Sequence, residues 1–345
     1  MLYAWYLANA RDLPWRIGPA DRARGARPDP YAVWLSEIML QQTTVMHAAP
    51  YYLKFIQRWP SVSDLAEADD ADVMAAWAGL GYYARARNLL KCARQVSDLG
   101  GFPDTVKGLK ALPGIGPYTA GALAALAFNR SEAAIDGNVE RVFARLLAET
   151  TPFPKAKSKL SIIVSSLVPE KTPAEFAEGL MDLGAMICTP KQPNCPACPL
   201  ISLCQAYRQG DPQTYPVKAP KTPKPERSGH AFLLTHQGHL LLERRAQTGL
   251  LGGMLGVPGS TWTEQASADC EGAPIGADWT YRGDVRHVFT HFSLVLKVWQ
   301  AEWSGQRGSA NVHGEWVAYE DISGLPTVFF KAVKLLSQTS PISER

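Results

Sequence analysis

The sequence predicts a two-domain protein in which a larger all-α domain precedes a smaller α+β domain. Up to about residue 187, apolar side chains recur at the three- and four-residue spacing of helices. Beyond a proline-rich segment the apolar residues alternate, as they do in strands. The length of 345 residues is also more than one ordinary hydrophobic core accommodates. We therefore place the helical domain at 1–212, a tether at 213–228 and the α+β domain at 229–345.

The composition is that of a folded, well-packed protein, with 46% hydrophobic and 19% charged residues. A net charge of +3 is compatible with a nucleic-acid partner but does not require one. No apolar run reaches the roughly 18 residues that a membrane span needs. The N-terminal stretch has no basic segment followed by an apolar one, so we expect a cytosolic protein without a secretion signal.

Helical periodicity is clearest in VERVFARLLA, where one face collects Val139, Val142, Phe143, Leu146 and Leu147. Two further helices are predicted on either side of GLGYY. Clusters of glycine and proline at GGFPDT, LPGIGP and TPFP mark other helix boundaries. The first domain is therefore expected to be a succession of helices.

The tether and the second domain follow from a change in pattern. The stretch DPQTYPVKAPKTPKPERSG holds five prolines and four cations, which is typical of an extended, polyproline-like chain. After it, HAFLLTHQGHLLLERR predicts a β-hairpin, and HFSLVLKVW predicts a half-buried strand. TVFFKAVKLLS predicts a helix near the end of the chain.

Four of the six cysteines are concentrated in one short loop, at Cys188, Cys195, Cys198 and Cys204. Structural disulfides are rare in a reducing compartment, so clustered thiols there indicate metal ligands. Zinc modules usually pair two short knuckles across a longer gap, whereas this loop has a single CxxC. Four thiolates in one compact loop suit an iron–sulfur cube, with zinc and four unrelated thiols as alternatives. Cys92 and Cys270 stand alone and are expected to be ordinary buried or free thiols.

The stretch LPGIGPYTAGALAAL, residues 112–126, places Gly114 and Gly116 at a tight turn before an apolar helix. Glycines let a backbone approach a ligand closely, and a helix N-terminus offers free N–H groups to an anion. A dinucleotide-binding loop would need a strand before the turn and a small residue where Thr119 stands. The pattern favours a helix–hairpin–helix that holds a DNA phosphate, with a plain helical turn as the alternative.

Glu37 is the one charged residue in the apolar run YAVWLSEIMLQQTTV. A buried carboxyl group without a cationic neighbour has a raised pKa and holds a proton near neutrality, as a general acid must. A partly exposed glutamate on one helix face is the alternative interpretation.

Asp136 lies at the start of the helix that contains VERVFARLLA. Aspartate is a favoured N-cap, and capping is the default interpretation. The helix dipole that favours a capping carboxylate also favours its charged form, so an N-cap can serve as a catalytic anion too.

These features together resemble the endonuclease III superfamily of DNA glycosylases, and within it the MutY type, the adenine DNA glycosylases. The resemblance covers nearly the whole chain. It is carried by LPWR, WLSEIMLQQT, GLGYYARARNL, LPGIGPYTAGAL, DGNVERV, the cysteine loop at 187–204 and HVFTH. It implies a helix–hairpin–helix glycosylase domain, a [4Fe–4S] cluster held by the four cysteines, and a smaller Nudix-like domain.

The resemblance also implies a role for each catalytic residue. It assigns Glu37 to protonation of N7 of an adenine extruded from the duplex, and Asp136, beside Asn138, to stabilisation of the cationic sugar. Relatives that also cut the DNA backbone have a nucleophilic lysine where this chain has Tyr118. The resemblance therefore implies an enzyme that releases the base and stops.

Further positions are assigned to DNA by the same resemblance. Trp15, Arg16 and Glu178 match residues that line the adenine pocket. Residues that probe the gap left by base flipping are matched by Gln42, Leu80 and Tyr82. In the second domain, Phe289, Thr290 and His291 match a loop that inspects 8-oxoguanine opposite the adenine. The family more often has serine at the position of Thr290, and the acidic metal-binding core of active Nudix enzymes is missing.

The expected partner is double-stranded DNA with A·8-oxoguanine or A·G mispairs, bound by a monomer. A thymine or oxidised-pyrimidine glycosylase of the same superfamily is the alternative enzyme, and Glu37 with the Nudix-like domain disfavours it. A non-catalytic iron–sulfur protein that binds DNA or senses redox state is a third possibility. Such a protein would not need an isolated acid in an apolar helix together with a tyrosine in the hairpin.

Overall fold

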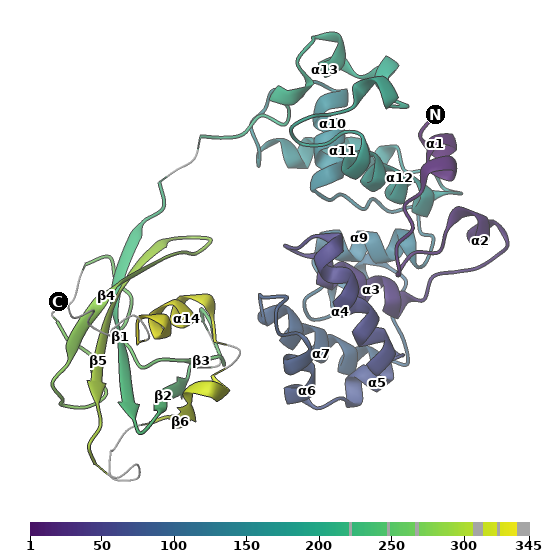
Figure 1. The fold of residues 1–345 in the computed structure, drawn as a ribbon. Helices are drawn as coiled ribbons and strands as arrows, with labels where there is room; N and C mark the ends of the chain where they lie inside the picture. Colours follow the sequence, from purple (N-terminus) through teal and green to yellow (C-terminus); the bar gives the residue numbers. More distant parts are fainter. Residues whose placement is uncertain (221–222, 247–248, 266–268, 306–312, 323–324, 337–345) are drawn as a thin grey trace, which may run out of the picture. The chain divides into compact units, whose positions relative to one another are not determined.

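The computed structural model describes residues 1–220, 223–246, 249–265, 269–305, 313–322 and 325–336. The chain divides into two compact units, Met1–Pro220 and Lys221–Arg345. The first is helical and the second is built on a β-sheet (Figure 1). This confirms the expected combination of an all-α domain with a smaller α+β domain. Within the described residues, no helix combines the length and the apolar character that crossing a bilayer requires.

The helices of the first unit are α1 (Leu2–Asn9), α2 (Pro19–Ala23), α3 (Pro30–Leu40), α4 (Val45–Arg58), α5 (Val62–Glu67), α6 (Asp70–Ala76), α7 (Ala84–Asp98), α8 (Val106–Lys110), α9 (Pro117–Leu126), α10 (Gly137–Leu146), α11 (Ala156–Ser166), α12 (Pro173–Met186) and α13 (Gln205–Arg208). Side chains cap the N-termini of α3, α4, α5, α6, α8 and α10 by accepting from free backbone N–H groups. The predicted break at GLGYY falls between α6 and α7.

Two hydrophobic cores hold the helical unit together, and α3 and α9 contribute to both. In α3, Trp34 packs in the core shared with α4–α8, while Val33 packs in the core shared with α10–α12. In α9, Leu123 packs in the first of these cores and Ala122 packs in the second. Figure 1 shows α9 between the two groups of helices. Because both faces of α3 are buried, a charged residue on that helix has little access to water.

The expected tether at 213–228 is shorter in the structure. Its first part pairs with the helical unit, since Phe153 donates its N–H to the carbonyl of Val217 at 2.9 Å and the N–H of Ala219 donates to Phe153 O at 3.4 Å. Its last part belongs to strand β1, which begins at Glu226. An extended, proline-rich backbone still offers carbonyls and some N–H groups to a neighbouring segment, so composition alone did not show where it leaves the first unit.

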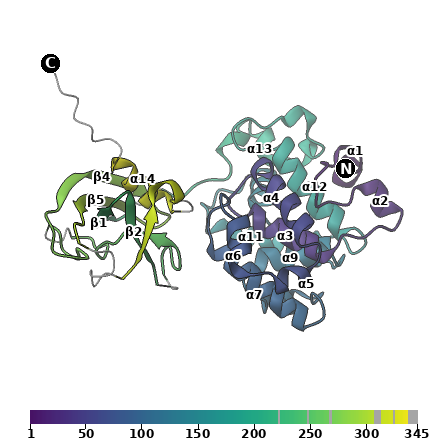
Figure 2. The same ribbon diagram turned by 60° about the horizontal axis from the view of Figure 1, so that its bottom comes forward.

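The second unit contains β1 (Glu226–His236), β2 (His239–Arg244), β3 (Leu255–Gly256), β4 (Thr280–Val288), β5 (Ser293–Glu302), β6 (Glu315–Ala318) and α14 (Thr327–Val333). The strands form one mixed sheet in the order β3-β2-β1-β5-β4, and β6 pairs with β2 (Figures 1 and 2). β1 and β5 are parallel, whereas β4 is antiparallel to β5. The predicted hairpin is β1–β2, with Gln237 and Gly238 in the left-handed region at its turn.

The alternation seen in the sequence separates the two faces of this sheet. Leu233 faces the core that includes Phe329 of α14. The next residue, Leu234, faces the opposite side and packs with Trp279 and Trp316. Buried and less buried positions also alternate along most of β5, as HFSLVLKVW predicts.

Candidate active site

A cavity of about 260 Å³ lies in the helical unit, lined by residues of α3, α9, α10, α12 and the segment that precedes α2. This volume is close to the lower end of the range of about 300–1,000 Å³ found for small-molecule pockets, which suits a single flat base. The fold places seven of the predicted site residues around it, namely Trp15, Arg16, Glu37, Tyr118, Asp136, Asn138 and Glu178.

Glu37 projects from α3 with 7% of its surface exposed, which excludes the interpretation as an ordinary solvated glutamate. The pKa of its carboxyl group is raised to about 7, mainly by burial. A hydrogen bond with Tyr118 opposes this rise in pKa, and the charge of Asp136 adds to it. The cation of Arg16 lowers the pKa of Glu37 to a smaller extent, and the carboxylate of Glu178 raises it. Near neutrality the group can therefore both hold and release a proton.

Tyr118 lies in the first turn of α9, directly after the hairpin. Burial raises the pKa of its hydroxyl well above the ordinary value, and the charges of Glu37 and Asp136 act in the same direction. The hydroxyl therefore stays protonated and donates to Glu37. All residues that line the cavity lie in the described part of the chain, and none of them is a lysine.

Asp136 is the N-cap of α10, as the sequence predicts, and it also lines the cavity. Its Oδ1 accepts from the backbone N–H groups of Asn138 at 2.9 Å and Val139 at 2.8 Å. Its Oδ2 accepts from Nδ2 of Asn138 at 2.7 Å. The carboxylate is thereby fixed at the positive end of a helix, which confirms the N-cap, and it borders the cavity at the same time.

Arg141, one turn further along α10, links this cap to the cysteine segment. Its Nη2 donates to Oδ1 of Asn138 and to the carbonyl of Gly184, each at 2.7 Å. Its Nε donates to the carbonyl of Cys188 at 2.8 Å. The amide of Asn138 is thus held at its oxygen by Arg141 and at its nitrogen by Asp136. The periodicity of α10 gave no indication of this role for Arg141.

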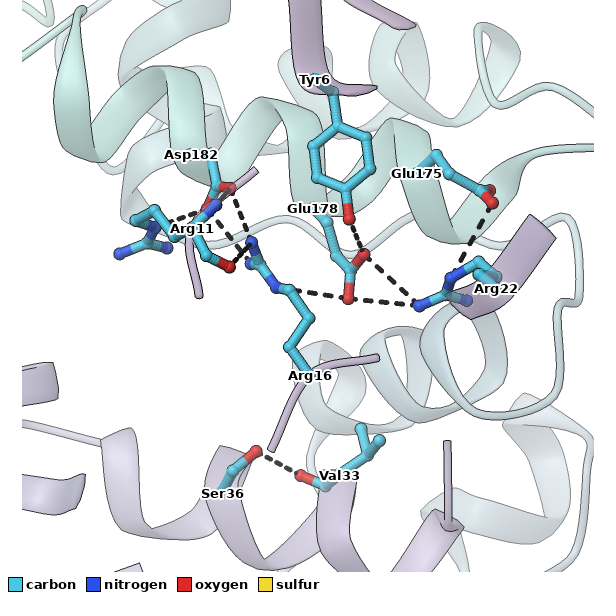
Figure 3. A network of polar contacts seen from close by, with 9 residues as sticks. All are labelled: Tyr6, Arg11, Arg16, Arg22, Val33, Ser36, Glu175, Glu178 and Asp182. Atoms are coloured by element: carbon cyan, nitrogen blue, oxygen red, sulfur yellow. Dashed lines mark hydrogen bonds and ion pairs between the residues drawn. The ribbon is translucent and has the colours of Figure 1, made fainter. Parts of the chain in front are cut away.

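Arg16 is held in the wall of the cavity by two carboxylates of α12 (Figure 3). Its Nη1 and Nη2 donate to the two oxygens of Asp182 at 2.6 and 3.1 Å. Its Nε lies 3.5 Å from Oε1 of Glu178. Arg11 also donates to Asp182, through Nε at 2.6 Å and through its backbone N–H at 3.0 Å. This segment has no regular structure from residue 10 to residue 18 beyond a short turn, so ion pairs fix it to α12.

Glu178 has three side-chain partners in a buried environment. Besides Arg16, the Tyr6 hydroxyl of α1 donates to Oε2, and Nη2 of Arg22 lies 3.4 Å from each carboxylate oxygen. Burial raises the pKa of Glu178, and the cations of Arg16 and Arg22 counteract the rise. Sequence analysis missed Tyr6, Arg22 and Asp182. Asp182 is isolated within the run GLMDLGAM, which is the same signal that identified Glu37.

Of the three residues predicted to probe the duplex, Gln42 and Tyr82 are exposed, and both have positive φ, 60° and 50°. Leu80 is 5% exposed and packs in the first hydrophobic core, so the structure does not bring it to the surface. Its aliphatic side chain completes that core, whereas the GLGYY motif alone did not show which of its residues face inward. None of the three lines the cavity.

Arg85 of α7 joins the two segments that carry Gln42 and Tyr82. Its Nη1 donates to three carbonyls at the end of α3, those of Ile38, Met39 and Gln41 at 2.9, 3.1 and 2.6 Å. Its Nη2 donates to the carbonyls of Leu80 and Gly81 at 3.0 and 3.2 Å. A cation at the C-terminus of a helix is favoured by the dipole. Sequence analysis missed Arg85, because backbone carbonyls have no sequence signature.

The predicted hairpin lies between α8 and α9. Gly114 has φ of +75°, and a Cβ there would stand 2.9 Å from Cβ of Asn88, so both conformation and space favour glycine. Gly116 is the N-cap of α9, and a Cβ there would meet nothing within 4 Å. Gly116 has no side chain to cap α9, and Pro117 has no N–H, so the N–H groups that follow receive no side-chain cap, as a phosphate site would need.

The four cysteines of the loop come together around one small cavity beside Arg145, and none is in a disulfide. Arg145 is 1% exposed. Its Nη1 donates to Sγ of Cys188 at 3.2 Å, and its Nε donates to the carbonyls of Pro212 and Tyr215. Among the described residues, no group of three or more His, Cys, Asp or Glu side chains is arranged to hold a metal ion. Cys92 and Cys270 are also free thiols, the first buried and the second partly exposed.

In the second unit, Thr290 and His291 are exposed in the turn between β4 and β5. Phe289 is half-buried and stacks on Trp262, with ring centroids 5.6 Å apart. Nζ of Lys224 donates to the carbonyl of Phe289 at 2.6 Å. The predicted loop therefore consists of one anchored aromatic residue and two free polar ones.

Comparison with known proteins agrees with this architecture. The model of the HhH-GPD superfamily of base excision DNA repair proteins matches residues 35–169, and a NUDIX domain model matches residues 230–335. Adenine DNA glycosylase of Homo sapiens is 34% identical over 93% of this chain and 70% of its own length. The enzyme of the same name from Buchnera aphidicola subsp. Acyrthosiphon pisum is 37% identical over 70% of this chain and 68% of its own.

A solved structure of a thermostable thymine-DNA glycosylase is 31% identical, with a TM-score of 0.52, and covers 60% of this chain and 94% of its own. The helical unit with its hairpin and carboxyl-lined cavity thus defines a base excision DNA glycosylase of the HhH-GPD class. Within that class, the chain belongs to the adenine DNA glycosylase family.

Proposed function

We propose that this protein hydrolyses the N-glycosidic bond of adenine mispaired with 8-oxoguanine, and secondarily with guanine, leaving an abasic site in duplex DNA. The observation that carries the proposal is Glu37, a buried acid with a pKa raised to about 7 in the wall of a base-sized cavity. Similarity to adenine DNA glycosylases over most of the chain supports adenine as the base.

Glu37 would act first, as a general acid toward N7 of an adenine turned out of the duplex. Protonation at N7 makes the base a better leaving group, because the electrons of the breaking C–N bond are accepted by a cationic ring. A carboxyl group with a pKa near the working pH is suited to this transfer. The Glu37 carboxylate that results can then take a proton from the attacking water.

Asp136 would stabilise the cationic sugar that develops as the base leaves. Its carboxylate is oriented by the N-terminus of α10 and by Asn138, so it needs no reorganisation when the charge appears. The two carboxyl groups then have separate roles, as in glycoside hydrolysis, with one protonated and one anionic.

We further propose that the enzyme releases the base without cutting the DNA strand. Tyr118 stands where a Schiff-base lysine would be required, and no lysine lines the cavity. Borohydride should trap little enzyme on DNA, and Tyr118→Lys should introduce some trapping. Efficient trapping of the native protein on DNA at neutral pH would contradict the proposal that the enzyme releases the base without a lysine nucleophile.

The four loop cysteines would hold a [4Fe–4S] cluster. The donor set suits this group by its chemistry, since four thiols border one cavity and Arg145 donates to Sγ of Cys188, although the described thiols are not arranged as ligands of a metal ion. The cluster would serve as a structural clamp for the segment that contacts Arg141 and Arg145, and no catalytic step passes through it. Protein purified without air should contain nearly four irons per chain, whereas stoichiometric zinc would contradict the assignment.

Lesion specificity would come from Thr290 and His291, which the second unit presents in an exposed turn. The enzyme would act as a monomer. The deciding experiment is incubation with duplexes that contain A·8-oxoguanine, A·G, T·G or an oxidised pyrimidine, followed by alkali cleavage. Adenine release, fastest opposite 8-oxoguanine, is expected. Release of only thymine or an oxidised pyrimidine would show that the substrate is a pyrimidine and not adenine.

A further inference from the structure

A buried tyrosine of the first helix, Tyr6, contacts the cavity wall without lining the cavity itself. Tyr6 is fully buried on α1, and its hydroxyl donates to Oε2 of Glu178 (Figure 3). A Cβ on Gly179 would stand 3.2 Å from Cβ of Tyr6, so glycine allows α1 and α12 to approach closely at this point. The tyrosine is therefore held in register with Glu178 by packing as well as by its hydrogen bond.

The partners of Glu178 come from three separate parts of the chain. Tyr6 belongs to α1, Arg22 to α2, and Arg16 to the irregular segment between them. Arg22 and Arg16 lie 3.4 and 3.5 Å from the carboxylate, and Tyr6 donates its hydroxyl to Oε2. The Tyr6 hydroxyl is thus the contact through which α1 contributes to the position of the Glu178 carboxylate.

Glu178 in turn contributes to the position of Arg16, which lines the cavity with Glu37. Asp182 holds the terminal nitrogens of the Arg16 guanidinium, and Glu178 faces its Nε, so the two carboxylates fix the plane of the group. Figure 3 shows the guanidinium between them.

We propose that Tyr6 is a positioning residue for adenine excision, which fixes the Glu178 carboxylate and, through it, Arg16 and the electrostatic environment of Glu37. The inference rests on the proposed glycosylase function. It makes α1 a support of the catalytic cavity, even though no residue of α1 lines it.

The charges around Glu37 give the proposal a measurable signature. The hydrogen bond from Tyr6 lowers the pKa of Glu178, against the rise that burial causes. Without the hydroxyl the pKa of Glu178 rises further, so its carboxylate carries its negative charge over a narrower range of pH. That charge raises the pKa of Glu37, whereas the Arg16 cation lowers it. A weaker negative charge on Glu178 therefore lowers the pKa of Glu37. The Arg16 cation, which Glu178 then neutralises less, lowers it in the same direction.

The other charged groups around this pair act on it in fixed directions. Asp182 raises the pKa of Glu178, and Arg22 lowers it. On the side of Glu37, Asp136 raises its pKa, and the Tyr118 hydrogen bond lowers it. Replacement of Tyr6 by phenylalanine leaves these four groups in place, so the change in pH dependence reports on Glu178 and Arg16.

The test compares full-length Tyr6→Phe with Tyr31→Phe under single-turnover conditions on the A·8-oxoguanine duplex, from pH 5.5 to about 9. Tyr31 is a matched control, because it is also buried, and its hydroxyl donates to the carbonyl of Trp59 at 2.8 Å, outside the cavity. Tyr6→Phe should slow excision at neutral pH by about tenfold and move the loss of activity at high pH to lower pH. Tyr31→Phe should keep the native pH profile.

A double variant tests whether Tyr6 acts through Glu178. If it does, Tyr6→Phe combined with Glu178→Gln should be no slower than Glu178→Gln alone. A pH profile of Tyr6→Phe that superimposes on the native one, or additive effects in the double variant, would overturn the inference while the native enzyme still excised adenine. Failure of the native enzyme on every adenine mispair would instead overturn the proposed function.

Discussion

Nδ2 of Asn138 donates to Oδ2 of Asp136 at 2.7 Å, while Oδ1 of Asp136 accepts the backbone N–H of the same asparagine at 2.9 Å. Asn138 therefore holds both oxygens of the carboxylate, one through its side chain and one through its backbone. An asparagine at position 136 could still accept the two backbone N–H groups through its oxygen, because asparagine caps helices about as well as aspartate. Its amide nitrogen, however, would face Nδ2 of Asn138, which is also a donor.

Asp136→Asn should slow adenine excision at least about a hundredfold and cost about 1–3 kcal/mol of folding stability, because Nδ2 of Asn138 loses its acceptor. The rate falls because the negative charge beside the cationic sugar is lost, although the N-cap is retained. Excision rates and urea unfolding measure the two effects separately. The matched control is Asp69→Asn at the N-cap of α6, where Asp69 accepts the N–H of Ala71 at 2.7 Å. Equal excision rates for Asp136→Asn and the native protein would show that the negative charge of Asp136 is not needed for catalysis.

Glu37→Gln should abolish excision, leave mispair binding nearly unchanged and stabilise the fold at high pH. A carboxyl group whose pKa rises from 4.5 to about 7 on folding binds more protons in the native state than in the unfolded state. Native stability therefore falls as pH rises from about 4.5 to about 7, and the glutamine variant avoids this loss. The gain at pH 8 should approach about 3 kcal/mol, at 1.36 kcal/mol for each pKa unit.

Urea unfolding at pH 4.5 and pH 8 measures this difference. Glu67→Gln, at an exposed position of α5, serves as the control and should unfold with the native pH dependence. Appreciable turnover by Glu37→Gln would exclude Glu37 as the acid. Equal stabilities of Glu37→Gln and native protein at pH 8 would show that the carboxyl group is not desolvated.

Arg85→Lys should weaken base extrusion by about tenfold, because lysine keeps the charge but loses the planar donors that reach five carbonyls. The loops that carry Gln42 and Tyr82 would then no longer be fixed relative to each other. A fluorescent purine in place of the target adenine reports extrusion. Arg94→Lys is the control on the same helix, since Arg94 donates to the carbonyls of Ala66 and Ala68. Unchanged extrusion in Arg85→Lys would limit Arg85 to a structural role.

A chain that ends at Pro220 should keep its cavity chemistry and lose its preference for 8-oxoguanine over guanine by about ten- to hundredfold. Residue 220 is the appropriate end, because Val217 and Ala219 still pair with Phe153. In the full chain, Thr290→Ala and His291→Ala should each show part of the loss. Thr290→Ser should retain the preference, as should Glu320→Ala in another exposed turn. Full lesion preference in the shortened protein would assign recognition to the helical unit.

Much of the fold was predictable because its signals are local. A helical or alternating apolar pattern reports on which faces of one segment are buried, so VERVFARLLA predicted α10 and HFSLVLKVW predicted β5. Glu37 was singled out for a similar reason, since a single charge in an apolar run is a candidate for burial, and the packing of α3 on both faces then buried it. Asp182 had the same signal in GLMDLGAM.

The sequence by itself thus determined the two domain types and the cysteine loop, and it singled out the hairpin and Glu37 as candidates. Only the tertiary structure decided which side chains act together, as when Tyr6 reaches Glu178 and Arg85 reaches the carbonyls of Gln41 and Gly81. It also placed Leu80 inside the core and extended the helical unit to Pro220. The physical reason is that these partners are distant in the chain or are backbone groups, which every residue has, so their pairing depends on packing between elements rather than on any local pattern.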